Sequence, residues 1–230
     1  MRNLTILPAA GQASRMRGMP KFLLPYDSSY ETLIERHIRL SLDWAEIVVV
    51  PTRAEFAPML VALGMPNDRV VISVIESETM SETVKSVASW FSFDRYVVVM
   101  PDTFFGGETP YQYLANSSAP LDLAAWKIRK NQAGKLGQVE LDKDGNVIAH
   151  QDKTEGCLFR HSWGAMSFDR KLKDLIQVNQ PHVGYIIDPA LDMGLTVRAR
   201  VFRGEYFDCG TPKEYFEMIG SKYVAGSAGR

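Results

Sequence analysis

A loop of small residues with two nearby cations follows the first apolar run of the sequence. The run covers residues 4–8, and Arg15 and Lys21 follow the small residues of the loop. A loop of this kind after a parallel strand lets backbone amide groups approach a phosphate closely. The sequence therefore predicts that the loop binds the phosphates of a nucleotide. The residues expected to contact the nucleotide here are Ala9, Ala10, Gly11, Gln12, Ala13 and Ser14.

Two aspartates far apart in the sequence are candidate ligands of a metal ion. Asp102 follows Pro101 after the apolar run of residues 96–100, so it is expected at the carboxyl end of a strand. Asp208 comes shortly before Thr211, which is expected to cap a helix together with Glu214. Mg²⁺ usually takes one or two protein carboxylates and completes its shell with water and substrate phosphates. The two aspartates therefore predict a magnesium site, with Pro101 beside the nucleotide.

Other phosphate and metal motifs do not fit this sequence. A Walker loop needs Gly-Lys-Ser or Gly-Lys-Thr after four intervening residues, and none follows Gly11. The dinucleotide fingerprint needs a second glycine at position 13, which is alanine here. Asp142 and Asp144 lack the other ligands of a calcium loop and are expected in a hairpin turn.

The elements that must position these side chains alternate between strand and helix. Apolar β-branched runs at 47–50, 70–75 and 96–100 are separated by segments of helical periodicity, which indicates a mostly parallel sheet covered on both faces. Further strands are expected at 121–128, 137–141, 147–151 and 197–202, and helices at 55–63, 169–178 and 183–193. Two more helices are expected to begin at a capping box of Ser28 with Glu31, and at Thr79.

Four short segments, in the same order, resemble the sugar-phosphate nucleotidylyltransferase family. The family's first loop has the pattern A-A-G-x-G-T-R-M…P-K-x-L-L-P, and Ala13 and Ser14 stand here where it has glycine and threonine. The matching residues of that loop are Ala9, Ala10, Gly11, Arg15, Met16, Pro20, Lys21, Leu23, Leu24 and Pro25. The resemblance implies a Rossmann-like nucleotide-diphospho-sugar transferase fold, an α/β/α arrangement of three layers around a mostly parallel mixed sheet. One domain is expected over residues 1–230, with an NTP-binding half at about 1–120, an acceptor half at about 121–224 and a flexible tail at 225–230.

The second half of the chain resembles the acceptor half of the same family. A glycine-valine strand, an acidic hairpin and a lysine segment follow in the family's order, with Asp152 and Thr154 in place of its glutamate and proline. The resemblance implies that Lys153 contacts the acceptor phosphate. The residues that it implies for acceptor binding are Gly137, Glu140, Lys153 and Trp163.

The resemblance implies an enzyme that moves a nucleoside monophosphate from an NTP to a sugar phosphate, with Mg²⁺ as cofactor and pyrophosphate as product. In this hypothesis Arg15 holds the departing pyrophosphate, Lys21 stabilises charge near the α-phosphate, and Lys153 holds the attacking phosphate. The base is expected near residues 76–82 and residues 9–10, where Ser81, Glu82 and Thr83 offer polar groups at a helix start. The sequence leaves the identity of the base and of the sugar open.

Two other functions remain as alternatives. A cytidylyl- or guanylyltransferase acting on an alcohol phosphate or a pterin cofactor shares the first loop, but the acceptor-half resemblance favours a sugar phosphate. A non-catalytic nucleotide-binding regulatory protein on the same fold is disfavoured, because both cations of the loop and both aspartates are present.

Charge and composition exclude several classes of protein. The chain has 26 basic and 27 acidic residues and a net charge of −1, without the basic excess of nucleic-acid-binding proteins. No apolar stretch is long enough to span a bilayer, and the two cysteines are far apart, so a cytoplasmic protein without disulfides is expected. The four histidines have no metal-ligand spacing and are expected at the surface or in packing. A homo-oligomer is compatible with the sequence.

Overall fold

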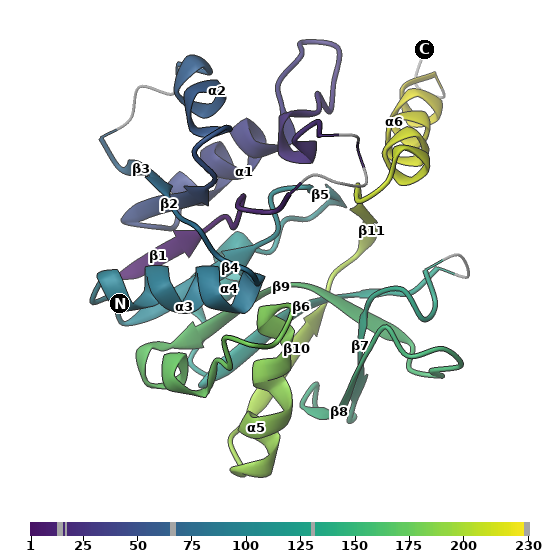
Figure 1. Ribbon diagram of the computed structural model, residues 1–230. Helices are drawn as coiled ribbons and strands as arrows, with labels where there is room; N and C mark the ends of the chain where they lie inside the picture. Colours follow the sequence, from purple (N-terminus) through teal and green to yellow (C-terminus); the bar gives the residue numbers. More distant parts are fainter. Residues whose placement is uncertain (13–15, 17, 65–67, 130–131, 228–230) are drawn as a thin grey trace.

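The computed structural model describes residues 1–12, 16, 18–64, 68–129 and 132–227, and a single large sheet runs through it (Figure 1). Across this sheet the strands are β10 (Val197–Val201), β6 (Leu121–Lys127), β9 (His161–Asp169), β4 (Arg95–Val99), β1 (Asn3–Ile6), β2 (Ile47–Thr52) and β3 (Val70–Val74). Strand β9 is antiparallel to both neighbours, and the other neighbouring strands are parallel. The prediction of a mostly parallel mixed sheet is confirmed.

Helices cover both faces of the sheet, as alternate residues of β4 show. Val97 and Val99 pack in one apolar cluster, whereas Tyr96 and Val98 pack in another, because successive side chains of a strand point to opposite faces. The helices on the Val97 side are α1 (Leu33–Leu42), α2 (Ala57–Ala62) and α4 (Tyr111–Asn116). Those on the Tyr96 side are α3 (Met80–Trp90), α5 (Ile187–Asp192) and the 3₁₀-helices η3 (Arg170–Leu175) and η4 (Val183–Ile186). The predicted three layers are therefore present.

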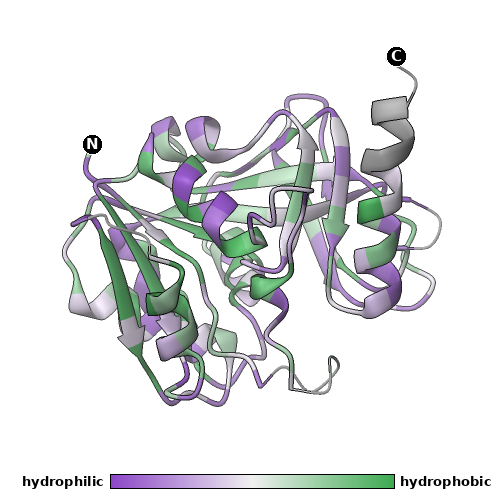
Figure 2. Cartoon of the chain, turned by 90° about the horizontal axis from the view of Figure 1, so that it is seen from above, coloured by the Kyte–Doolittle hydropathy of each residue, from purple (hydrophilic) through white to green (hydrophobic). Residues whose placement is uncertain are grey.

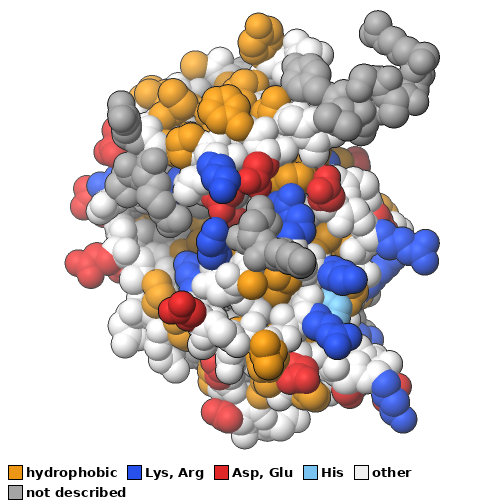
Figure 3. All heavy atoms as spheres, turned by 90° about the vertical axis from the view of Figure 1, so that its right-hand side faces the viewer, with side chains coloured by type: hydrophobic (Ala, Val, Ile, Leu, Met, Phe, Trp, Pro, Cys, Tyr) orange, Lys and Arg blue, Asp and Glu red, His pale blue; other side chains and the backbone are white. Residues whose placement is uncertain are grey.

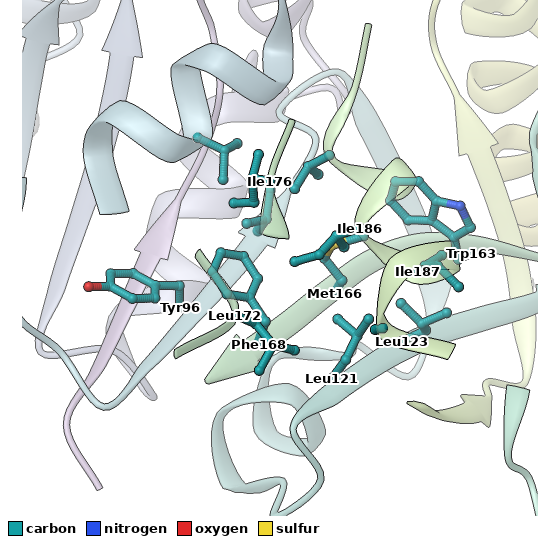
Figure 4. Packing of buried hydrophobic residues seen from close by; sticks show 14 of the residues in the cluster. Tyr96, Leu121, Leu123, Trp163, Met166, Phe168, Leu172, Ile176, Ile186 and Ile187 are labelled. Atoms are coloured by element: carbon teal, nitrogen blue, oxygen red, sulfur yellow. The ribbon is translucent and has the colours of Figure 1, made fainter. Parts of the chain in front are cut away.

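The core on the Tyr96 side joins elements from both halves of the sequence. Side chains of β4, β6 and β9 meet those of η3, η4 and α5 in one continuous cluster (Figure 4). Several strands are almost uniformly hydrophobic along their length (Figure 2), as expected for strands covered on both faces.

Two pairs of strands lie outside the row of seven. Strands β7 (Gly137–Leu141) and β8 (Val147–Asp152) form the predicted hairpin, and β7 also pairs with β9. Strand β5 (Thr103–Gly107) pairs antiparallel with β11 (Gly204–Asp208) in a separate small sheet. The sequence analysis predicted neither β5 nor α4. The short 3₁₀-helix η2 (Lys21–Leu23) follows the first loop, and α6 (Pro212–Ser227) follows β11.

Three details of the predicted helices are wrong. The capping box of α1 consists of Thr32 and Glu35, whose backbone amides each donate to the other's side chain at 2.8 and 3.3 Å. Ser28 and Glu31 have the same spacing but lie one turn too early, and Glu31 accepts a hydrogen bond from Arg39 at 2.9 Å. The helix expected at 169–178 is the shorter 3₁₀-helix η3, and the helix expected at 183–193 is divided into η4 and α5.

In the part of the chain that the structure describes, no helix has the length and apolarity to cross a bilayer.

Candidate functional site

Loops at one edge of the main sheet enclose a cavity of about 400 Å³. Its lining comes from residues 8–12 after β1, residues 100–102 after β4, residues 77–80 with Thr83 at the start of α3, and residues 20–22. The loops meet because β1 runs parallel to both β4 and β2, so the carboxyl ends of these strands lie at the same edge. This is the edge at which open α/β sheets bind ligands, and the volume is within the usual range of ligand pockets.

The first loop is attached to the end of β2. The amide of Ala9 donates to the carbonyl oxygen of Pro51 at 2.9 Å, and the Thr52 hydroxyl donates to the carbonyl oxygen of Ala9 at 3.2 Å. Of the predicted nucleotide-contacting residues, five line the cavity: Ala9, Ala10, Gly11, Gln12 and Pro101. The other three residues predicted in this loop, Ala13, Ser14 and Arg15, lie outside the described residues.

Lys21 and Asp102 form an ion pair in the lining of the cavity. The Lys21 ammonium lies 3.4 Å from Asp102 Oδ2, and both side chains retain some contact with solvent. Lys21 is the first residue of η2, and the next residue, Phe22, packs edge-on against Phe56 with 6.0 Å between the ring centroids. This packing anchors η2, so that the neighbouring lysine can point into the cavity.

Asp102 and Asp208 lie beside each other although 106 positions separate them in the sequence. The pairing of β5 with β11 places Asp208 opposite Thr103, and the Cys209 amide donates to the carbonyl oxygen of Asp102 at 2.9 Å. Burial raises the pKa of the Cys209 thiol, and the nearby negative charges of both aspartates raise it further.

The cap predicted for the helix after Asp208 is present, because the Thr211 hydroxyl lies 2.8 Å from the Glu214 carboxylate and accepts from the Glu214 amide. Acidic and basic side chains adjoin near the middle of the face shown in Figure 3.

The donor set fits magnesium better than a transition metal. Within the described ranges, no group of three or more histidine, cysteine, aspartate or glutamate side chains is close enough to hold a metal ion. Asp102 lines the cavity and the backbone of Asp208 lies next to it, which matches the sparse protein coordination of Mg²⁺, an ion that draws its remaining ligands from water and substrate phosphates.

The start of α3 lines the cavity, but only Thr83 of the three residues that the sequence analysis selected there belongs to the lining. Ser81 is buried on the face of α3 that also carries Val84, and the Glu82 carboxylate accepts from the Glu78 amide at 2.8 Å. Neither Ser81 nor Glu82 is part of the cavity lining, which residues 77–80 form here together with Thr83. The sequence contains a signal that Ser81 faces the core, because Ser81 continues the apolar stripe of Val84 and Ala88 at helical spacing.

The predicted acceptor residues are only partly brought together. Gly137 lies directly against the Trp163 indole, since a Cβ atom at position 137 would overlap the indole nitrogen. Lys153 is exposed at the end of the β7–β8 hairpin, where its amide donates to Leu136 at 3.2 Å. Glu140 is three positions beyond Gly137 in β7, so its exposed side chain lies on the opposite face of the strand. Glu140 is therefore not grouped with Gly137 and Trp163.

The sequence analysis missed a polar contact next to Lys153. His182 Nε2 lies 2.7 Å from Asp152 Oδ2, and both side chains are largely buried. Asp152 belongs to β8 and His182 precedes η4, so no local pattern links the two residues. The sequence analysis expects all four histidines at the surface or in packing, and nothing in the sequence neighbourhood of His182 identifies its partner.

A protein-family model matches most of the sequence. The model of the MobA-like NTP transferase domain matches residues 5–178, which include all loops that line the cavity. The chain belongs to the MobA-like NTP transferase family. The matched range of this NTP transferase ends before His182 and before Asp208. A search of curated proteins finds no match to the sequence.

Solved structures with little sequence similarity share the fold of this NTP transferase. A protein from Bacillus anthracis described as a glucose-1-phosphate thymidylyltransferase has a TM-score of 0.82 at 15% identity, covering 95% of this chain and 94% of its own. The UTP-bound UGPase from Acinetobacter baumannii has a TM-score of 0.76 at 16% identity, with coverages of 96% and 93%. The inositol-1-phosphate CTP transferase from T. maritima also scores 0.76, at 13% identity, with coverages of 96% and 95%. The predicted nucleotide-diphospho-sugar transferase fold is thereby confirmed.

Proposed function

We propose that this NTP transferase moves a nucleoside monophosphate from an NTP to a sugar phosphate and releases pyrophosphate, with Mg²⁺ held by Asp102 and Asp208. The observation that carries the proposal is the contact of Lys21 with Asp102 in the lining of the cavity, where the pairing of β5 with β11 holds the backbone of Asp208 next to Asp102. A cation next to two carboxylates supplies both the positive group and the metal ligands that a triphosphate requires.

In the proposed reaction an oxygen of the acceptor phosphate attacks the α-phosphorus of the NTP in line with the leaving group. A bond forms between that oxygen and the α-phosphorus, while the bond from the α-phosphorus to the oxygen shared with the β-phosphate breaks and its electron pair leaves with pyrophosphate. The acceptor phosphate is already ionised, so the chain needs no strong general base. Positioning and charge stabilisation then account for the catalysis.

The chain's own groups divide this work between the two sides of the site. The backbone of residues 9–12 approaches the phosphates, and the Lys21 ammonium stabilises negative charge that develops near the α-phosphate. Bound Mg²⁺ would neutralise phosphate oxygens and align the reacting groups. Lys153 is proposed to hold the acceptor phosphate, and Trp163 with Gly137 to form part of the acceptor site. The acceptor class draws support from the sugar phosphate and inositol phosphate enzymes named for the same fold.

Metal-dependent turnover tests the proposal. Pyrophosphate release is measured with each of the four NTPs against glucose 1-phosphate and myo-inositol 1-phosphate, in the presence of Mg²⁺ and again with excess EDTA. We expect turnover that requires Mg²⁺ and falls by about two orders of magnitude or more in Asp102→Ala. Asp144→Ala is the matched control, because Asp144 lies exposed in the β7–β8 turn. Near-normal turnover in Asp102→Ala would contradict the mechanism.

A further inference from the structure

One edge of β11, the strand that ends at Asp208, pairs with β5, and the other edge is bound by side chains. On that other edge the carbonyl oxygen of Tyr206 accepts two hydrogen bonds, from Gln132 Nε2 at 3.0 Å and from Arg129 Nη2 at 3.3 Å. A carbonyl group in this position normally accepts from the backbone of a further strand. Two side chains from the loop after β6 take the place of that strand here.

The loop after β6 holds Gln132 in one orientation. The backbone amide of Gln132 donates to the carbonyl oxygen of Arg129 at 2.9 Å, and the backbone amide of Arg129 donates to Gln132 Oε1 at 3.1 Å. Because the side-chain oxygen of Gln132 accepts within the loop, its NH₂ group faces β11. Gln132 is 8% exposed, so water has little access to this contact. The loop leaves the sheet at the same edge as Asp102, since β6 and β4 are both antiparallel to β9.

Arg129 also contacts the residues on either side of the Tyr206 carbonyl group. Its guanidinium carbon lies 4.2 Å from the centre of the buried Phe207 ring, which is a cation–π contact. Its Nη1 atom lies 3.7 Å from the Glu205 carboxylate. The loop after β6 therefore contacts three consecutive residues of β11, and Asp208 is the next residue of the chain.

Asp208 is also fixed by the chain that follows it. The Cys209 amide donates to the carbonyl oxygen of Asp102 at 2.9 Å. The Asp208 carboxylate lies against Gly210, because a Cβ atom on this glycine would be 3.0 Å from Asp208 Oδ1. Since β11 is extended between Tyr206 and Asp208, a shift of the Tyr206 carbonyl group moves Asp208 relative to Asp102. Mg²⁺ demands nearly ideal octahedral geometry, with ligands at about 2.0–2.1 Å, so a small shift of one ligand weakens binding.

We propose that Arg129 and Gln132 are positioning residues of the metal site, which hold Asp208 in place relative to Asp102 through the Tyr206 carbonyl group. This inference rests on the proposed function, in which the two aspartates hold Mg²⁺. Neither Arg129 nor Gln132 is part of the cavity lining, and neither has to touch the metal or a substrate. Their loss should therefore weaken metal binding without removing a reacting group.

The test measures binding of Mn²⁺ alone, as a substitute for Mg²⁺, by the loss of the free Mn²⁺ signal in electron paramagnetic resonance. Gln132→Met keeps the length of the side chain and removes its hydrogen-bonding groups. Arg129→Met removes the second donor to Tyr206 and the charge over Phe207. We expect each variant to raise the dissociation constant of Mn²⁺ about tenfold, as loss of an outer partner of a metal ligand commonly does. The Mg²⁺ concentration for half-maximal turnover should rise with it.

A second buried glutamine provides the matched control for Gln132. Gln138 Oε1 accepts from the Gly134 amide at 2.8 Å, and Gln138 Nε2 donates to the carbonyl oxygen of Phe159 at 3.1 Å. Gln138→Met therefore removes the same kind of contact from a different strand. We expect it to lower the stability in urea about as much as Gln132→Met, and to leave the dissociation constant of Mn²⁺ within about twofold.

A second arginine over an aromatic ring provides the matched control for Arg129. Arg2 lies 4.7 Å from the centre of the Phe93 ring and pairs with Glu46 at 2.8 Å. Arg2→Met should leave the dissociation constant of Mn²⁺ within about twofold. If Gln132→Met fails to fold, Arg129→Met decides the matter, since the Arg129 side chain is 31% exposed and its loss leaves no large cavity.

Two results would overturn the inference and leave the proposed function intact. One is a dissociation constant of Mn²⁺ that stays within about twofold of the unmodified protein in Gln132→Met and Arg129→Met, while Asp208→Asn raises it. The other is an equal rise in Gln138→Met, which would mean that loss of any buried glutamine weakens the site. An unchanged dissociation constant in Asp208→Asn would instead refute the role of Asp208 in the proposed function, and this inference with it.

Discussion

Replacing Lys21 by alanine removes the positive charge that faces the carboxylate of Asp102. Two unit charges 3.4 Å apart attract by about 5 kcal/mol at an effective dielectric constant of about 20. In the free protein water offsets most of this energy, because the two side chains are 15% and 25% exposed. We therefore expect the free energy of unfolding to fall by only about 1 kcal/mol in Lys21→Ala.

The effect on turnover should be much larger than the effect on stability. When substrate phosphates replace the water, Lys21 is expected to stabilise charge that develops only in the transition state. Loss of such a group commonly costs on the order of 3 kcal/mol, which lowers kcat by about 10²-fold. Lys21→Arg keeps the charge on a bulkier group, and we expect a smaller loss of about tenfold.

The assay is pyrophosphate release at saturating NTP, acceptor and Mg²⁺, with urea unfolding measured on the same samples. Lys171→Ala is the matched control, because Lys171 is an exposed lysine on η3, remote in the sequence from the cavity loops. A kcat in Lys21→Ala within about threefold of the unmodified protein would refute the assigned role. Equal losses in Lys21→Arg and Lys21→Ala would show that shape, not charge, is what matters at this position.

The carboxylate pair, a buried arginine and a buried histidine lead to further expected outcomes. Asp102→Asn and Asp208→Asn should each raise the Mg²⁺ concentration for half-maximal activity at least about tenfold, as measured by Mg²⁺ titration, because even the loss of an outer partner of a metal ligand has an effect of that size. Arg95→Met should lower the free energy of unfolding in urea by about 3–5 kcal/mol, since the fully buried Asp122 loses its positively charged partner at 2.9 Å. Burial lowers the pKa of His37 to about 3, so the unfolded chain binds a proton first as the pH falls below about 6.5. Stability should therefore fall by about 2 kcal/mol between pH 6.5 and pH 5, and His37→Asn should lack this loss.

Each of these outcomes has its own control. Asp144→Asn removes an exposed carboxylate from a turn and should leave the Mg²⁺ dependence unchanged, so an equal shift in Asp144→Asn would argue against a specific metal site. Arg170→Met removes an exposed contact to Ser92 and should cost less than about 1 kcal/mol. An Arg95→Met protein as stable as the Arg170→Met protein would contradict the role of the buried ion pair. A His37→Asn protein with the same stability change between pH 6.5 and pH 5 would remove His37 as its source.

Local patterns in the sequence were sufficient for the framework of the fold. The β-branched runs, the helical periodicity and the Thr79 start of α3 each involve residues within a few positions of one another, and the structure confirms the elements that they predict, apart from the helices expected at 169–178 and 183–193. The first loop was recognisable for the same reason, because its small residues and cations are consecutive. The misplaced capping box shows the limit of this approach: Ser28 with Glu31 and Thr32 with Glu35 satisfy the same local rule, and the start of the apolar periodicity at Leu33 decides between them.

Tertiary structure decided how distant groups meet. The pairing of β5 with β11 places Asp208 beside Asp102, and no pattern within either segment encodes that register. The contact between Asp152 and His182 likewise depends on how the β7–β8 hairpin packs against η4. The direction of Met80 and Thr83 toward the cavity follows from how α3 lies on the sheet. Sequence alone determined which chemical groups this protein has and which short elements carry them. Their convergence required the folded chain, because the free energy of non-local packing selects one strand register and one side-chain direction among several that the local sequence permits.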